Sequence, residues 1–121
     1  MNKGYFGVIG LGYVGLPLAI QFTKAGYHVL GVDIDEKRIG LLKGGQSYIG
    51  DISDADLKSA VEQGLLLPTT DYGALRDVEA MSICVPTPLR KTREPDVSFV
   101  VSVAERIAES LQKDQTVILE S

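Results

Sequence analysis

The stretch Gly10-Leu11-Gly12-Tyr13-Val14-Gly15 decides how this sequence is interpreted, because it matches the pattern G-x-G-x-x-G. It follows a β-branched and aromatic run over 5–9 and opens a segment whose apolar residues recur at helical spacing. In that setting the first glycine permits a tight turn, the second lets a pyrophosphate approach the backbone, and the third lets helix and strand pack closely. The N–H groups of Tyr13 and Val14 would then face the anion at the positive end of the helix. This context predicts a dinucleotide-binding turn rather than a plain glycine-rich turn.

Working outward from this turn, strand-like and helical segments alternate along the chain. The helical spacing that begins at Tyr13 runs to Gly26, a residue suited to a left-handed helix stop. Further strands are expected over 28–32, 65–69, 80–85 and 116–119, and helices over 35–42, 53–63 and 97–111, with loops over 44–52 and 86–95. Pro68 makes the strand over 65–69 the least regular of these. The alternation predicts an α/β fold, a Rossmann doubly wound parallel sheet of about five strands with right-handed crossovers.

Asp33 indicates which dinucleotide the turn would hold. It stands at the expected carboxyl end of the second strand, where such a site needs an acceptor for the adenosine ribose hydroxyls. A 2′-phosphate about 4 Å from this carboxylate would be repelled by about 4 kcal/mol per charge at an effective dielectric near 20, which favours NAD over NADP. Arg38 leaves the alternative open, because a nearby arginine can bind a 2′-phosphate. We interpret it instead as stacking on or flanking the adenine.

The composition narrows the classes of partner. Sixteen acidic against 12 basic residues give a net charge of -4, which argues against nucleic-acid binding through phosphate contacts. No apolar run approaches the length of a membrane span, and the N-terminus does not resemble a signal peptide. The single cysteine, Cys84, cannot form an internal disulfide or a cysteine metal cluster. We therefore expect a cytoplasmic protein with small-molecule partners, no nucleic acid, no membrane and no metal.

The remaining chemistry-bearing residues point to no catalytic group. His28 begins a strand at the amino edge of the sheet, whereas ligands of such folds bind beyond the carboxyl ends, so a structural histidine is expected. Cys84 lies nearer the site, but its neighbours offer no base or cation to form a thiolate. Arg90, Lys91 and Arg93 lie in the loop after the fourth strand, either as a solvated cluster or with Arg93 contacting a cofactor phosphate.

The last expected strand runs almost into the C-terminus, with only Glu120 and Ser121 after it. A complete dinucleotide fold of this type has a sixth strand. We therefore expect residues 1–121 to be one NAD-binding Rossmann domain, the N-terminal fragment of a longer protein.

Four segments together resemble the UDP-glucose/GDP-mannose dehydrogenase family: GLGYVGLPLA at 10–19, GVDID at 31–35, CVPTPL at 84–89 and REPD at 93–96. The run over 84–100 is most similar to the UDP-N-acetylglucosamine 6-dehydrogenases, which supply uronic acids for bacterial surface polysaccharides. The positions matching the family's cofactor contacts are Val14, Asp33, Arg38 and Thr87. Ser121 matches the first residue of a Ser-Thr pair that the family uses after the fifth strand.

The resemblance implies two successive NAD-linked oxidations, which take the primary alcohol of a nucleotide sugar through an aldehyde to a carboxylate. The family's catalytic cysteine belongs to a glycine-rich segment far downstream, so Cys84 is not its counterpart. The nucleotide sugar would bind the missing C-terminal part of a homo-oligomeric enzyme. The chain alone is expected to be inactive.

Two alternatives stay open at this point. A non-catalytic NAD-sensing module could carry the same turn and the same aspartate, but it should be complete within its chain and has no need of the loop over 86–96. A β-hydroxyacid dehydrogenase shares the first strand and turn but is not expected to contain CVPTPL.

Overall fold

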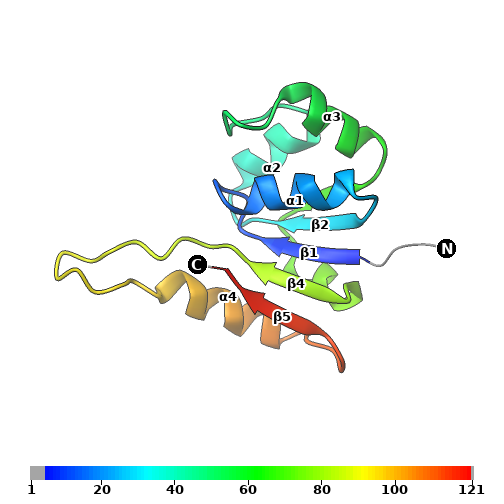
Figure 1. The fold of residues 1–121 in the computed structure, drawn as a ribbon. Coiled ribbons are helices and arrows are strands. Elements are labelled where there is room, and N and C mark those ends of the chain that lie inside the picture. The colour runs from blue at the N-terminus through cyan, green and yellow to red at the C-terminus, as the bar shows by residue number, and fades with distance from the viewer. Residues whose placement is uncertain (1–4, 121) are drawn as a thin grey trace.

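The computed structural model describes residues 5–120, and its centre is a five-stranded sheet with the strand order β3-β2-β1-β4-β5 (Figure 1). Every neighbouring pair of strands runs parallel. The chain starts in the middle of the sheet, builds outward through β2 and β3, and then crosses to β4 and β5 on the other side of β1. This order confirms the predicted doubly wound sheet. The strands are β1 (Tyr5–Ile9), β2 (His28–Val32), β3 (Leu66–Thr69), β4 (Ala80–Ile83) and β5 (Thr116–Leu119).

The α-helices lie close to where the sequence predicts them, and capping side chains mark the starts of two of them. They are α1 (Gly15–Lys24), α2 (Glu36–Lys43), α3 (Asp54–Glu62) and α4 (Ser98–Ala108), and a 3₁₀-helix, η1 (Tyr72–Asp77), lies between β3 and β4. Asp35 caps α2 by accepting from the N–H groups of Lys37 and Arg38, and Ser53 caps α3 by accepting from Asp56. No helix within residues 5–120 is both long and apolar enough to cross a membrane.

The predicted first helix and fourth strand need correction, and one further element was not predicted. The first helix begins at Gly15 rather than Tyr13, because Tyr13 and Val14 form a turn ahead of it. The fourth strand ends at Ile83 rather than Val85, because its partner β1 ends at Ile9. The 3₁₀-helix η1 was not expected, since six residues are too few to display a helical period.

Both faces of the sheet are covered, which explains the nearly continuous apolar runs of its inner strands. On one face, α1, α2 and α3 pack with Val8 and Val29 in one hydrophobic cluster. On the other face, η1 and α4 pack with Ile9 and Leu30 in a second cluster. Figure 1 shows the first three helices on one side of the sheet and α4 on the other. Successive residues of β1 and β2 thus serve opposite clusters, as strand geometry requires.

The two edge strands differ in how they meet solvent. Pro68 is tolerated within β3 because that strand pairs only with β2 and leaves its outer edge free of further strands among residues 5–120. In β5, which pairs only with β4, all four residues are exposed, and three of them are apolar. The β5 edge is therefore an apolar border of the described part of the chain.

Candidate functional site

The glycine turn, which comprises residues 10–15, lies where β1 ends and α1 begins, at the carboxyl edge of the sheet (Figure 1). The N–H of Gly10 donates to the carbonyl of Val32 at 2.8 Å, and Gly10 has a positive φ of 89°, which a side chain would strain. A β-carbon on Gly15 would stand 1.7 Å from the carbonyl oxygen of Gly10, so only glycine lets α1 approach β1 this closely. These two glycines hold the turn against the end of the sheet.

Gly12 differs from the other two glycines because no close contact within residues 5–120 requires a glycine at this position. An added β-carbon would meet only Nη1 of Arg38, at 3.7 Å, among its near neighbours. Tyr13 and Val14 beside it are exposed, and no residue within 5–120 bonds the N–H groups of Gly12, Tyr13 or Val14. The turn therefore presents open N–H donors at the positive end of α1, with no side chain at Gly12 in front of them. This arrangement fits the pyrophosphate of a dinucleotide.

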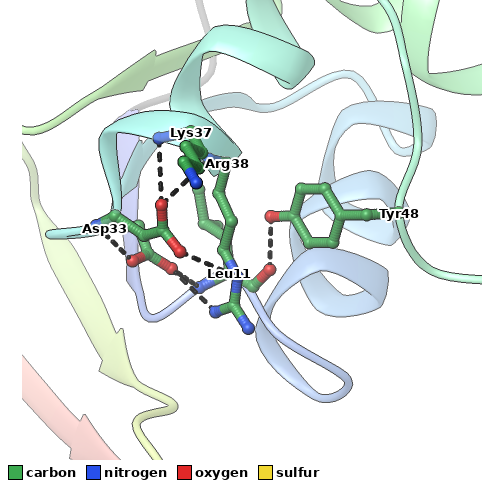
Figure 2. A network of polar contacts seen from close by, with 6 residues as sticks. Leu11, Asp33, Lys37, Arg38 and Tyr48 are labelled. Atoms are coloured by element: carbon green, nitrogen blue, oxygen red, sulfur yellow. Dashed lines mark hydrogen bonds and ion pairs between the residues drawn. The ribbon is translucent and has the colours of Figure 1, made fainter.

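Asp33 lies directly after β2, and its side chain is turned toward the glycine turn (Figure 2). Its Oδ2 accepts from the N–H of Leu11 at 2.9 Å and lies 3.3 Å from Nη1 of Arg38, while Oδ1 accepts from the N–H of Asp35 at 2.9 Å. The residue is only 6% exposed. The carboxylate is thus a buried anchor of the turn.

Arg38 and Tyr48 complete this polar network. The guanidinium of Arg38 lies against Asp33 and, at 3.9 Å, near Oδ2 of Asp35, and its carbon stands 5.4 Å from the ring centroid of Tyr48. The Tyr48 hydroxyl donates to the carbonyl of Leu11 at 2.5 Å. Burial raises the pKa of Tyr48 well above its ordinary value, and the Asp33 and Asp35 carboxylates reinforce this despite the opposing effect of Arg38. The phenol is therefore a hydrogen-bond donor throughout the physiological pH range.

Sequence reasoning missed Tyr48, which falls in the loop predicted over 44–52. Its contact with Leu11 joins residues 37 positions apart. No local pattern marks such a contact, because it depends on how the loop returns to the glycine turn after α2. A single tyrosine in a loop does not by itself indicate a role in a binding site.

The loop after β4 carries the other predicted contacts. Thr87 is exposed shortly after β4, and the chain then folds into an arm in which Leu89 bridges Pro95 in antiparallel fashion (Figure 1). At its tip Arg93 has a positive φ of 68°, and no hydrogen bond or ion pair within residues 5–120 joins it to the glycine turn. The predicted Ser121 lies outside the described residues.

Comparison with known proteins decides the family. Residues 5–121 match the family model described as "UDP-glucose/GDP-mannose dehydrogenase family, NAD binding domain". The chain belongs to the UDP-glucose/GDP-mannose dehydrogenase family. The predicted resemblance and the predicted cofactor, NAD, are confirmed, and the alternative of a β-hydroxyacid dehydrogenase is set aside.

Individual members of this family are similar over almost the whole chain. The UDP-N-acetyl-D-mannosamine dehydrogenase of Escherichia coli (strain K12) is 39% identical over 122 residues, which cover 100% of this chain and 28% of that protein. The UDP-N-acetyl-D-glucosamine 6-dehydrogenase of Pseudomonas aeruginosa is 38% identical, with 94% and 26% covered. The structure of a UDP-D-ManNAc dehydrogenase from Pyrococcus horikoshii matches with a TM-score of 0.89 at 36% identity, with 97% and 28% covered. The chain thus spans little more than a quarter of the length of these relatives.

Cys84 and His28 have side chains that can take part in catalysis, but both lie in structural positions in this domain. Cys84 is buried behind the glycine turn, and burial, aided by the Glu120 carboxylate, raises the pKa of its thiol to about 11. A thiol of that pKa is almost entirely protonated at neutral pH, whereas the thiolate is the nucleophilic form. His28 lies at the amino end of β2, where its ring stacks on Tyr5 at 4.9 Å and its Nδ1 lies 3.3 Å from the carbonyl of Gly64. Within residues 5–120 no group of three metal-binding side chains is found.

Proposed function

We propose that this chain binds NAD along the carboxyl edge of the sheet, with the pyrophosphate over Gly12 to Val14, as the N-terminal NAD-binding domain of a longer nucleotide-sugar dehydrogenase. The observation that carries the proposal is the set of open N–H groups at the start of α1 beside a glycine whose β-carbon would have room. Gly10 and Gly15 shape the turn, and Gly12, Tyr13 and Val14 contact the cofactor.

Asp33 and Arg38 would hold the adenosine end of NAD. A carboxylate has about four acceptor positions, and three of those on Asp33 are taken by Leu11, Asp35 and Arg38. A ribose hydroxyl can therefore use the remaining position on Oδ1, and a second hydroxyl can bind once the guanidinium moves off Oδ2. The Arg38 side chain is 42% exposed, so it has room to move toward the ribose or the adenine.

The nicotinamide end would lie on the β4 side of the turn. Thr87 follows β4, which is the strand next to β1, so it stands at the same edge of the sheet as the glycine turn. Arg93 and Ser121 are proposed as further cofactor contacts on this side. Bound NAD would supply hydride acceptance, and this chain would hold it in place.

For the longer enzyme, we propose oxidation of the primary alcohol of a UDP-sugar to the carboxylate with two NAD. The related proteins are named for several sugars, among them UDP-N-acetyl-D-mannosamine and UDP-N-acetyl-D-glucosamine. An N-acetylated UDP-hexosamine, UDP-N-acetylglucosamine or a close relative, is therefore the substrate we propose. We place this enzyme in the cytoplasm, as a homo-oligomer, in polysaccharide biosynthesis.

The test is a calorimetric titration of the chain and its Gly12→Val variant with NAD. The Gly12→Val variant should fold, because Gly12 has no positive φ and an added β-carbon would meet only Nη1 of Arg38, at 3.7 Å, but the valine side chain should occupy the pyrophosphate space. We expect at least about a tenfold loss of affinity, which corresponds to about 1.4 kcal/mol. Gly40→Val is the matched control, since a β-carbon there meets nothing within 4 Å and Gly40 lies on α2. Equal NAD binding by the parent and Gly12→Val would refute the proposal.

A further inference from the structure

We propose that Tyr48 is a positioning residue of the cofactor site, which orients the glycine turn through its hydroxyl and Arg38 through its ring. The inference rests on the proposed function, because it assumes that NAD lies over this turn. It extends the site to the loop between α2 and α3, a segment outside the glycine pattern and outside the strand ends.

The hydroxyl acts on the peptide that joins Leu11 to Gly12. The carbonyl of Leu11 accepts from Tyr48 at 2.5 Å, while the N–H of Leu11 donates to Asp33 at 2.9 Å. In a trans peptide the carbonyl of one residue and the N–H of the next point in opposite directions, and the described chain has no cis bonds. By holding the Leu11 carbonyl, Tyr48 therefore directs the N–H of Gly12 to the opposite side. That N–H is one of the open donors of the turn.

The ring acts on the Arg38 guanidinium. Its carbon lies 5.4 Å from the Tyr48 ring centroid, within cation–π distance, and its Nη1 lies 3.3 Å from Oδ2 of Asp33 (Figure 2). The ring thus forms a side wall that keeps the cation over the carboxylate. A guanidinium released from this wall is free to meet a 2′-phosphate, the group that distinguishes NADP from NAD.

Two substitutions separate these two effects. Tyr48→Phe keeps the ring beside Arg38 and removes the hydroxyl, whereas Tyr48→Leu removes both. Tyr27→Phe is the matched control, because Tyr27 is also half-buried but packs on Phe6 and Phe22 at the other end of the sheet. The affinities of all four proteins for NAD and NADP are measured by calorimetry at a temperature where circular dichroism shows each to be folded.

We expect Tyr48→Phe to bind NAD about fivefold more weakly than the parent, as for the loss of one hydrogen bond, with its preference for NAD over NADP unchanged. Tyr48→Leu should lose about tenfold or more and also show a narrower preference. A purely structural tyrosine would lower the melting temperature and leave both affinities of the folded protein unchanged. Tyr27→Phe should bind like the parent.

If Tyr48→Phe binds NAD as tightly as the parent does, while Gly12→Val binds NAD more weakly, the role of the hydroxyl is overturned and the proposed function stays intact. An unchanged preference in Tyr48→Leu would overturn the role of the ring. Should either variant not fold, the parent supplies a second measurement by NMR. Addition of NAD should shift the Tyr48 ring resonances and the Leu11 amide but not the Tyr27 ring, and the absence of these shifts would also overturn the inference.

Discussion

At the scale of single residues, Asp33 combines two roles that the sequence suggested only in part. Its carboxylate anchors the N–H of Leu11 and pairs with Arg38, and it is the acceptor proposed for the ribose. Because Arg38 offsets its charge, repulsion of a 2′-phosphate by Asp33 is weaker than an isolated carboxylate would produce. We therefore expect the preference for NAD over NADP to depend on the pair rather than on the aspartate alone.

We expect Asp33→Ser to weaken NAD binding about tenfold or more and to narrow the preference over NADP, since it removes a ribose acceptor and frees Arg38. Dissociation constants for both dinucleotides would measure this. Asp33→Asn is the comparison variant, because its one carbonyl oxygen can still accept from the Leu11 N–H while the charge and the second acceptor oxygen are lost. A parent protein that already prefers NADP would contradict the expectation and make Arg38 a 2′-phosphate ligand.

At the scale of elements, the β5 edge has the most exposed apolar surface of any strand. Val117, Ile118 and Leu119 are 42%, 44% and 56% exposed, and β5 pairs on one side only within residues 5–120. Such an edge favours pairing with another chain. We expect the isolated chain to associate at high concentration and Ile118→Lys to suppress it, as followed by sedimentation velocity.

The opposite edge of the sheet provides the control for this prediction. Leu67 on β3 is also 44% exposed, so Leu67→Lys adds the same charge at an equally exposed position. If association persists in Ile118→Lys but disappears in Leu67→Lys, the contact between chains is formed by β3 rather than by β5. Oligomers formed through β5 by the isolated chain need not reflect the assembly of a longer enzyme.

At the scale of the whole molecule, we expect this chain alone to catalyse no net oxidation of a nucleotide sugar, even when it binds NAD. Hydride transfer requires the sugar carbon to be held against the nicotinamide, and the glycine turn is bordered by exposed residues on its outer side. NADH absorbance, followed with purified chain and excess UDP-sugars, measures this. Turnover that disappears in Cys84→Ser would contradict the expectation and make that thiol a nucleophile.

A longer protein that contains this chain, assayed in the same way, should oxidise N-acetylated UDP-hexosamines in preference to UDP-glucose or GDP-mannose.

The elements that the sequence predicted well are those specified by neighbouring residues. β1, β2 and β5 have the predicted bounds, and Ser53 caps α3 by accepting from Asp56. These features depend on apolar runs, glycine punctuation and side chains within one turn of helix, all of which are visible in a short window. The glycine pattern belongs to the same class, because its meaning follows from the strand before it and the helix after it.

By itself, therefore, the sequence determined the sheet, the position of the turn and the family. Only the tertiary structure decided how the site is held: Leu11 is bonded by Asp33 from the next strand and by Tyr48 from a loop after α2. It also decided that Arg38 lies on Asp33 and that η1 covers one face of the sheet. Contacts of this kind join segments far apart in the chain, so they follow from the packing of the whole fold and leave no local pattern.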